Sequence, residues 1–158
     1  DQSEIRAVVA HEIGHYKHNH LLILAAVVAV LAGAGLWLVD RMLGAVPRSR
    51  DRQSPLVQNP AAIPLAHLVF ITFTLLTTPI IVSAERWVEV DADAYGLQLA
   101  NEPDGMAKAL IRTVDFRASS PGVLEETLFY DHPSIARRIR RAMEWKRNHP
   151  AGAGEGGQ

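Results

Sequence analysis

The sequence predicts a mainly α-helical protein embedded in a membrane, in which a hairpin of two transmembrane helices is followed by soluble helices. Residues 21–39 contain no charged side chain, and neither do residues 61–84. A helix of about 20 apolar residues is long enough to cross a bilayer. Most of the acidic and basic side chains lie beyond these two runs, so the membrane-like part of the chain is confined to its first 84 residues.

The composition limits the kinds of site that the chain can form. Its 158 residues suffice for one domain, and the formal net charge of −1 gives no indication of a nucleic-acid partner. Because there is no cysteine, disulfides and thiolate ligands are excluded, and any metal ion must be held by histidine, aspartate or glutamate. Since the chain begins at Asp1 within a helix-like pattern, we interpret it as part of a longer protein.

The first two predicted elements are helices in one proline-free stretch. We expect Ser3 to cap a helix over residues 3–20, with Glu4 near its positive end. The apolar run that follows predicts a transmembrane helix over residues 21–46, which either continues the first helix or is separated from it by a break. Residues 47–60 have the proline, serine and arginine content of a loop.

A second transmembrane helix is predicted over residues 61–84. The prolines and threonines inside this uncharged stretch are typical of a span that packs against other helices. Two buried helices of a soluble domain are the alternative explanation of the two apolar runs. Soluble helices of this length usually have a polar face, which both runs lack.

Residues 85–149 are predicted to be soluble and helical, and no strand is predicted anywhere. The glycine-rich and alanine-rich tail, residues 150–158, is predicted to be disordered, so that residues 1–149 form a single core. The elements expected after the second span are a charged helix to about Ala100, a turn at residues 101–105, an amphipathic helix at residues 106–118 and a final helix after Ser134.

Residues 11–15 read H-E-x-x-H, which is the spacing of a metal site on a helix. His11 and His15 lie one turn apart on the same face, so both imidazoles can bind one ion. Glu12 can reach a water molecule that the ion polarises and act as general base. Zinc suits this ligand set, and we expect one zinc ion per chain. A surface helix with two histidines is the alternative, but the small apolar residues 7–10 favour a buried site.

Two more histidines follow the motif. His18 lies about 10 Å beyond His11 along the helix axis, so we interpret His18 and His20 as interfacial or supporting residues and not as ligands. The metzincin pattern is excluded, because it requires glycine at position 18 and histidine at position 21, where this chain has His18 and Leu21.

The third ligand must therefore come from a distant part of the chain. Two antiparallel spans of similar length return the chain to the side of the membrane that it left. The acidic candidates there are Glu85, Glu89, Asp91 and Asp93, and the alternative is a solvated acidic face. His15 lies about six residues before the first span and Glu89 about five after the second, so their heights above the membrane match. Asp93 is suited to accept the remaining N–H of a ligating histidine.

Three motifs, in this order, resemble those of the type I CAAX prenyl proteases, integral-membrane zinc peptidases of the gluzincin class that are related to the bacterial stress protease HtpX. They are the H-E-x-x-H helix at residues 4–15, R-x-x-E-x-x-A-D at residues 86–93 and H-P-x-x-x-x-R-I at residues 132–139. The resemblance covers residues 4–145. One departure is Glu85, because the family often has serine at that place.

The resemblance implies a membrane-embedded gluzincin core and assigns the remaining motif residues. It implies that Glu89 is the third zinc ligand and that Asp93 supports a ligating histidine. It also implies that His132 stabilises the oxyanion and that Arg138 supports the site by ion pairing or by stabilising the transition state. The implied activity is zinc-dependent hydrolysis of peptide or protein substrates, including membrane-bound or prenylated ones.

The substrate is left open among three functions. The first is C-terminal trimming of CAAX-type proteins, and the second is quality control of damaged membrane proteins. The third is a non-catalytic membrane scaffold that uses zinc to tie its hairpin to the soluble helices. The intact Glu12 argues against the scaffold.

We expect a multi-pass protein of the bacterial inner membrane, with the lipid bilayer as a partner and the active site toward the cytoplasm. Basic residues on the predicted catalytic side favour this orientation, among them Lys17, Arg86 and those of the final helix. The three arginines of the loop at residues 47–60 oppose it. The high content of alanine and arginine is typical of a bacterial source.

Overall fold

The computed structural model describes residues 1–45, 62–113 and 121–150, and within these ranges it contains helices and no strand. This confirms the mainly α prediction. The predicted loop at residues 47–60, the end of the amphipathic helix and almost all of the predicted tail lie outside the described residues. The helices are α1 (Gln2–Lys17), α2 (His20–Ala45), α3 (Ala62–Ala100), α4 (Pro103–Arg112), α5 (Val123–Phe129) and α6 (Ile135–Asn148).

A break separates α1 from α2, which is one of the two arrangements expected from the sequence; the other was a single continuous helix. Asn19 has a φ of 54°, in the left-handed region that asparagine adopts more readily than most residues, and the chain changes direction there. The expected cap at Ser3 is wrong, because the helix begins at Gln2 after Asp1 and has no side-chain cap. The first turn is instead packed against α4, where a Cβ on Gly105 would lie 2.4 Å from the Ser3 carbonyl oxygen.

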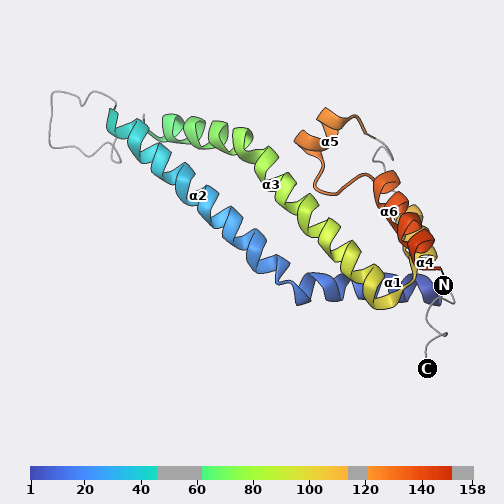
Figure 1. The fold of residues 1–158 in the computed structure, drawn as a ribbon. Coiled ribbons are helices and arrows are strands. Elements are labelled where there is room, and N and C mark those ends of the chain that lie inside the picture. Colours follow the sequence, from blue (N-terminus) through green and yellow to red (C-terminus); the bar gives the residue numbers. More distant parts are fainter. Residues whose placement is uncertain (46–61, 114–120, 151–158) are drawn as a thin grey trace, which may run out of the picture.

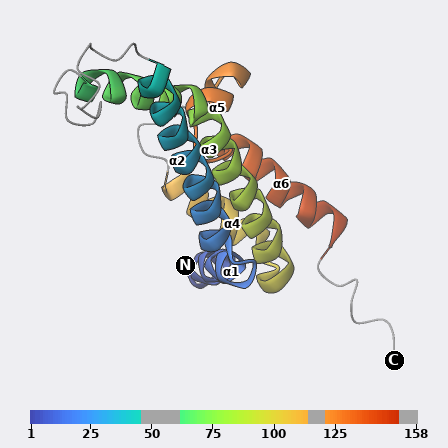
Figure 2. The same ribbon diagram turned by 90° about the vertical axis from the view of Figure 1, so that its left-hand side faces the viewer.

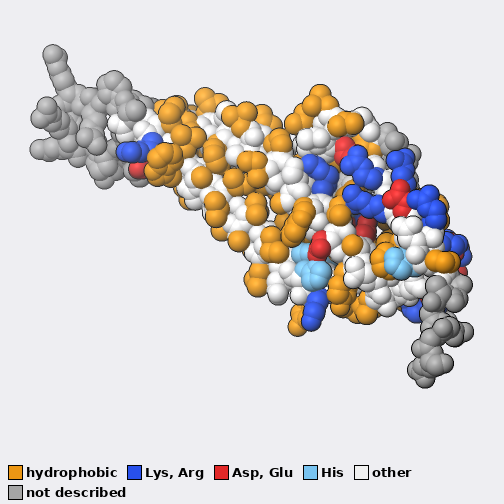
Figure 3. All heavy atoms as spheres, viewed as in Figure 1, with side chains coloured by type: hydrophobic (Ala, Val, Ile, Leu, Met, Phe, Trp, Pro, Cys, Tyr) orange, Lys and Arg blue, Asp and Glu red, His pale blue; other side chains and the backbone are white. Residues whose placement is uncertain are grey.

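Helices α2 and α3 form a long hairpin, and α1 crosses its end (Figure 1). Both are long and apolar enough to cross a membrane, and 6% of the apolar window of each is buried in the described structure. The core helices of a soluble protein would be mostly buried, so the soluble alternative is not supported. Apolar side chains cover the hairpin, whereas charged side chains gather at the opposite end of the molecule (Figure 3).

Helix α3 runs through the predicted end of the second span without interruption. Its 39 residues correspond to a length of about 58 Å, roughly twice the hydrocarbon thickness of a bilayer. Its apolar part ends at Ala84, so residues 85–100 project beyond the part that can lie in the membrane. The charged helix expected to follow the span is therefore the second half of the same helix.

The soluble end of the molecule is a small helical core. Helix α6 lies on the opposite side of α3 from α2 in both views (Figures 1 and 2). Helix α4 begins at Pro103, earlier than expected, because proline is favoured in the first turn of a helix. The short helix α5 was not expected. The buried apolar side chains of the core are Ala7, Leu97, Met106, Leu110 and Ala142.

The backbones of α1 and α3 approach each other closely. A Cβ on Gly14 would lie 3.1 Å from the Cα of Ala92, and one on Gly96 would lie 3.1 Å from the backbone nitrogen of His11. Both glycines are needed for this approach, because a side chain on either would push the helices apart. The crossing brings the histidine face of α1 against the acidic part of α3.

Candidate metal centre

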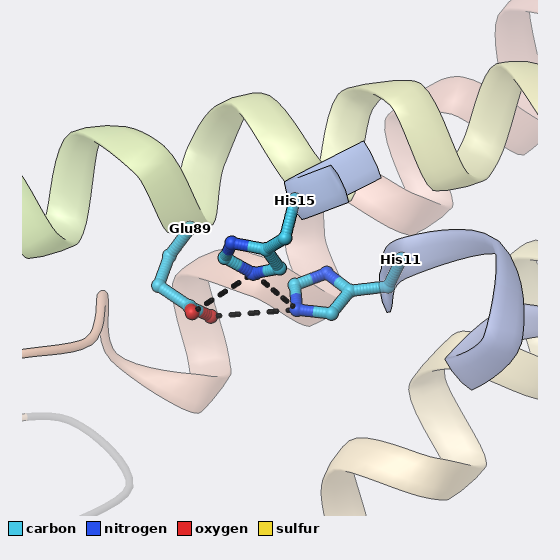
Figure 4. Close-up of side chains that lie close together, drawn as sticks. All are labelled: His11, His15 and Glu89. Carbon is cyan, nitrogen blue, oxygen red and sulfur yellow. Dashed lines mark hydrogen bonds and ion pairs between the residues drawn. The ribbon is translucent and has the colours of Figure 1, made fainter. Parts of the chain in front are cut away.

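Three side chains from two helices meet at one point. His11 and His15 extend from α1, and their Nε2 atoms lie 3.1 Å apart. Glu89 extends from α3, with Oε1 at 3.3 Å from Nε2 of His15 and Oε2 at 3.7 Å from Nε2 of His11 (Figure 4). Among the described residues, Glu89 is the one acidic candidate grouped with both histidines of the H-E-x-x-H motif.

The donor set of this group fits a zinc ion. The two histidines and the glutamate each offer one ligand atom, and these atoms all lie within 4.8 Å of one another. Burial, together with the neighbouring His11, lowers the pKa of His15 below its ordinary value, so that the ring is held in the neutral form that binds a metal. Nitrogen and carboxylate donors are the ones that zinc takes when no thiolate is present.

Asp93 and Arg138 lie directly behind the ligands, as the motif resemblance implies. Asp93 is 2% exposed, and its Oδ1 lies 3.0 Å from Nδ1 of His11. Arg138 donates from Nε and Nη2 to the two oxygens of Asp93, at 2.7 and 2.6 Å. Its Nη1 lies 3.2 Å from Oε2 of Glu89, a contact that the sequence did not indicate. One guanidinium therefore pairs with the carboxylates of both Asp93 and Glu89.

The pairing of Asp93 with Arg138 overcomes the cost of burying them. Burial alone would raise the pKa of Asp93, but contacts with His11 and Arg138 outweigh it and hold this pKa below its ordinary value. Burial would likewise lower the pKa of Arg138, yet its carboxylate partners raise it. Both groups are therefore charged near neutral pH, and each depends on the other to remain so.

Glu12 and His132 line the same cavity as the three grouped side chains. The cavity has a volume of about 420 Å³. Nε2 of His132, which comes from the segment between α5 and α6, lies 3.6 Å from Oε1 of Glu89. The structure thus brings together all seven residues that the sequence selected, namely His11, Glu12, His15, Glu89, Asp93, His132 and Arg138.

The segment that carries His132 is held at both ends by polar contacts. Arg86 donates to the backbone carbonyls of Glu126 and Tyr130, at 2.8 and 2.5 Å, and so binds the end of α5 to α3. The buried carboxylate of Glu126 accepts the backbone N–H of Ser134 at 3.3 Å. Neither these contacts nor α5 itself was predicted from the sequence. A glutamate three residues after Gly122, at the start of α5, is the signal that could have revealed this helix.

A further group of three polar side chains lies next to the centre. His20 is 1% exposed, with Nδ1 at 3.0 Å from Nδ1 of His15 and Nε2 at 3.1 Å from Oδ2 of Asp91. His18 also contacts Asp91 through Nδ1. The expectation that His18 and His20 are not ligands of the H-E-x-x-H centre agrees with this grouping, since neither belongs to the cluster around Glu89.

One wall of the cavity is apolar. Val8 faces it from α1, and Met106, Ala109 and Leu110 face it from α4. Of the small apolar residues before the motif, Ala7 and Ala10 are buried as expected, whereas Val8 and Val9 are about half exposed, at 46% and 51%. The cavity therefore has an apolar side next to a side of charged and imidazole groups.

Curated bacterial proteins resemble the chain over most of its length. It is 30% identical over 154 residues to the uncharacterized metalloprotease YhfN of Bacillus subtilis, covering 95% of this chain and 36% of that protein. It is 34% identical over 163 residues to a protease HtpX homolog of Thermoanaerobacter pseudethanolicus, and the match covers 89% of this chain and 53% of that protein. A protease HtpX homolog of Acidiphilium cryptum is 29% identical over 161 residues, with 89% and 54% covered. No solved structure shows a significant match.

The chain spans about a third of YhfN and about half of each HtpX homolog. The family model of peptidase family M48 matches residues 1–146, which include both histidines, Glu89 and the segment up to α6. This match covers nearly the whole chain and agrees with the metalloprotease names of the relatives. The chain therefore belongs to peptidase family M48.

Proposed function

We propose that this chain is the catalytic core of a zinc-dependent membrane endopeptidase. The observation that carries the proposal is the meeting of His11, His15 and Glu89 at one point, with Glu12 lining the same cavity. Two imidazoles and a carboxylate would hold the ion and leave a fourth position open, which is the arrangement of catalytic zinc sites. Bound there, zinc supplies a Lewis acid that polarises a peptide carbonyl and makes water more acidic.

The residues around the ligands have separate proposed roles. Glu12 accepts a proton from water and later gives it to the departing amine. His132 donates a hydrogen bond to the substrate oxygen as negative charge develops on it. Arg138 holds Glu89 and Asp93, and Asp93 in turn lies against His11, so that both act by keeping ligands in place.

We assign as substrates polypeptides that expose apolar residues, in the manner of a quality-control protease. The apolar side of the cavity supports this assignment, because it offers a place for an apolar side chain next to the reacting bond. The names of the HtpX homologs support it as well. C-terminal trimming of prenylated proteins is the second candidate, and the motif resemblance is the observation that favours it.

We also propose that the protein crosses the membrane more than once and that its active site faces the cytoplasm. The two long apolar helices support the first point. The basic side chains beyond the apolar hairpin, on α6 in particular, support the second. A cavity that lies close to the membrane surface would be accessible to unfolded membrane segments.

The general-base role is tested by Glu12→Gln. We expect this variant to bind about one zinc per chain and to lose at least about 100-fold in the rate of cleavage of an unfolded membrane protein, because the amide cannot accept the proton. Glu85→Gln, on α3 but outside the ligand group, is the matched control and should cleave like the parent. Full activity of Glu12→Gln would exclude the mechanism, and bound zinc without cleavage by any form would favour the scaffold.

The substrate class is tested separately on the parent chain. The chain would be offered, in detergent, a panel of unfolded membrane proteins and of farnesylated peptides that still carry the three residues after the farnesylated cysteine. Cleavage of the membrane proteins at apolar positions is the expected result. Release of the tripeptide alone would assign the chain to the prenylated substrates.

A further inference from the structure

The second ring nitrogen of His15 faces another histidine. In this chain Nε2 of His15 points to Glu89 and His11, whereas its Nδ1 lies 3.0 Å from Nδ1 of His20. On the other side of the His20 ring, Nε2 lies 3.1 Å from Oδ2 of Asp91. The side chains of His15, His20 and Asp91 therefore form a continuous row of polar contacts that leads away from the candidate metal centre.

The direction of the protons along this row follows from the ligand role proposed for His15. A neutral ring that binds zinc through Nε2 carries its proton on Nδ1. That proton faces His20, whose Nδ1 must then be the acceptor. A His20 ring that accepts at Nδ1 carries its proton on Nε2, where the carboxylate of Asp91 can accept it in a hydrogen bond. In this arrangement, each ring N–H in the row faces an acceptor: that of His15 faces His20, and that of His20 faces Asp91.

The structure holds His20 firmly in this orientation. The side chain is 1% exposed, and the Trp87 ring lies edge-to-face against it with a centroid distance of 6.1 Å. His20 is also the first residue of α2, directly after the left-handed Asn19. The break between α1 and α2 thus turns the His20 ring back toward α1, and burial keeps it there.

A second metal ion is the competing explanation of this cluster. His18, His20 and Asp91 could by themselves hold one, since their ligand atoms lie within 4.8 Å of one another. A metal on Nε2 of His20 would, however, move the ring proton to Nδ1, where it would face the N–H of His15. Two opposed N–H groups repel, so a second ion would oppose zinc binding at the first site.

We propose that His20 is a positioning residue for the metal centre, which accepts the N–H of His15, fixes the tautomer and orientation of that ring, and is itself oriented by Asp91. Asp93 lies against the other histidine, His11, at 3.0 Å. Each zinc-binding histidine then has its own supporting group. The inference rests on the proposed function, because it requires zinc on Nε2 of His15.

The test is the zinc affinity of purified variants of the chain, measured by competition with a chromogenic chelator. His20→Phe keeps a ring but removes the acceptor, and we expect it to bind zinc about 10- to 100-fold more weakly, as is usual when a partner of a ligand is lost. His20→Asn places an amide oxygen near the position of Nδ1 and should regain most of this loss. The absorption spectrum of the cobalt-substituted chain should change in His20→Phe and much less in His20→Asn, which a purely structural role would not produce.

Two surface variants keep the test informative if His20→Phe does not fold. Asp91→Ala removes the acceptor of His20 from a partly exposed position and should weaken zinc binding. His18→Asn changes a neighbour of Asp91 that does not touch His15, so it should bind one zinc with the affinity of the parent.

The outcomes separate this inference from the proposed function. If the parent binds zinc and both Asp91→Ala and the folded His20 variants bind it equally well, the positioning role is wrong. A parent that binds two zinc ions, one of which is lost in His18→Asn, would replace it with the second metal site. A parent that binds no zinc would overturn the proposed function and this inference together.

Discussion

At the scale of single residues, Arg138 is the group on which the charges of the centre depend. Its guanidinium donates to both oxygens of Asp93 and lies 3.2 Å from Glu89. The contacts with His11 and Arg138 hold the pKa of Asp93 below its ordinary value, so that this buried carboxylate is ionised before any metal binds.

Replacing Arg138 by methionine should destabilise the soluble end of the molecule. The change leaves Asp93 buried without its main partner, which typically lowers the free energy of unfolding by about 3–5 kcal/mol. Thermal unfolding of the zinc-free chain in detergent would measure the loss. Arg138→Lys, which keeps the charge but not the two-pronged contact, should lie between the parent and Arg138→Met. Equal melting temperatures for all three would contradict this account of the pair.

The assignment of Glu89 as third ligand predicts the behaviour of its neighbours on α3. Glu89→Ala should lose most of the bound zinc, measured by elemental analysis after gel filtration, because two histidines alone hold zinc weakly. Glu85→Ala removes an acid one turn earlier, outside the ligand group, and should retain about one zinc per chain. If Glu89→Ala retained its zinc, a different third ligand would be required.

The sequence was informative about ligands and less so about their supporting residues. The spacing of His11 and His15 is a local property of a helix, so it could be read directly. The role proposed for His20 could not be read in this way, because on an uninterrupted helix its side chain would be rotated by about 140° from that of His15. The left-handed Asn19 removes this rotation, and no pattern in the sequence indicates how far a break turns the next helix.

At the scale of elements, the crossing of α1 and α3 decides whether the centre can form. The histidines are on one helix and Glu89 is on the other, so their separation depends on how closely the two backbones approach. Gly14 and Gly96 lie at this contact. Helix propensity alone would favour alanine at both positions, and the packing therefore outweighs propensity here.

Gly14→Ala should weaken both the fold and the metal site. The added Cβ would lie 3.1 Å from the Cα of Ala92, so the helices must separate slightly, and overpacking of this kind typically costs about 1–3 kcal/mol. We expect a lower melting temperature and weaker zinc binding in the chelator assay. Gly33→Ala, on α2 with no atom within 4 Å of its added Cβ, is the control and should change neither. If Gly14→Ala had the same melting temperature and zinc affinity as this control, the close contact between the α1 and α3 backbones would not be required.

Helix α3 illustrates which element boundaries the sequence can provide. Its hydropathy changes at Ala84, where the uncharged stretch of the sequence ends. A change of hydropathy does not end a helix, however, because the backbone hydrogen bonds continue wherever no breaking residue intervenes. Helix α5 was missed for the opposite reason: its seven residues are too few for a periodic pattern, and contacts from Arg86 hold it.

At the scale of the whole molecule, an apolar hairpin and a charged helical core lie at opposite ends (Figure 3). The charged end contains the candidate metal centre, formed by α1, α3 and the segment before α6. This separation agrees with the order predicted from the sequence, in which the second half of the chain lies outside the apolar spans. For the proposed membrane protease, the orientation of the hairpin then decides on which side of the membrane substrates are met.

The proposed orientation can be tested with single cysteines, because the chain contains none of its own. Arg147→Cys places a thiol on exposed α6, and Gly44→Cys places one at the far end of the hairpin. With the site toward the cytoplasm, a membrane-impermeant maleimide should label Cys at 147 in inverted vesicles and Cys at 44 in intact spheroplasts. The reverse pattern would place the site on the outer side, and labelling of both from one side would contradict a spanning hairpin.

For the proposed protease, the continuity of α3 also determines where a substrate can be cut. Glu89 lies five residues beyond Ala84 on an unbroken helix, which corresponds to a height of about 7.5 Å above the apolar part. In the proposed placement of α3 across the bilayer, the helix therefore fixes the height of the centre above the membrane. With this geometry, the proposed protease would reach bonds near the membrane surface, whereas bonds far out in solution or deep in the lipid would lie out of its reach. Selection among polypeptides would then depend on the depth of a bond as well as on the side chains around it.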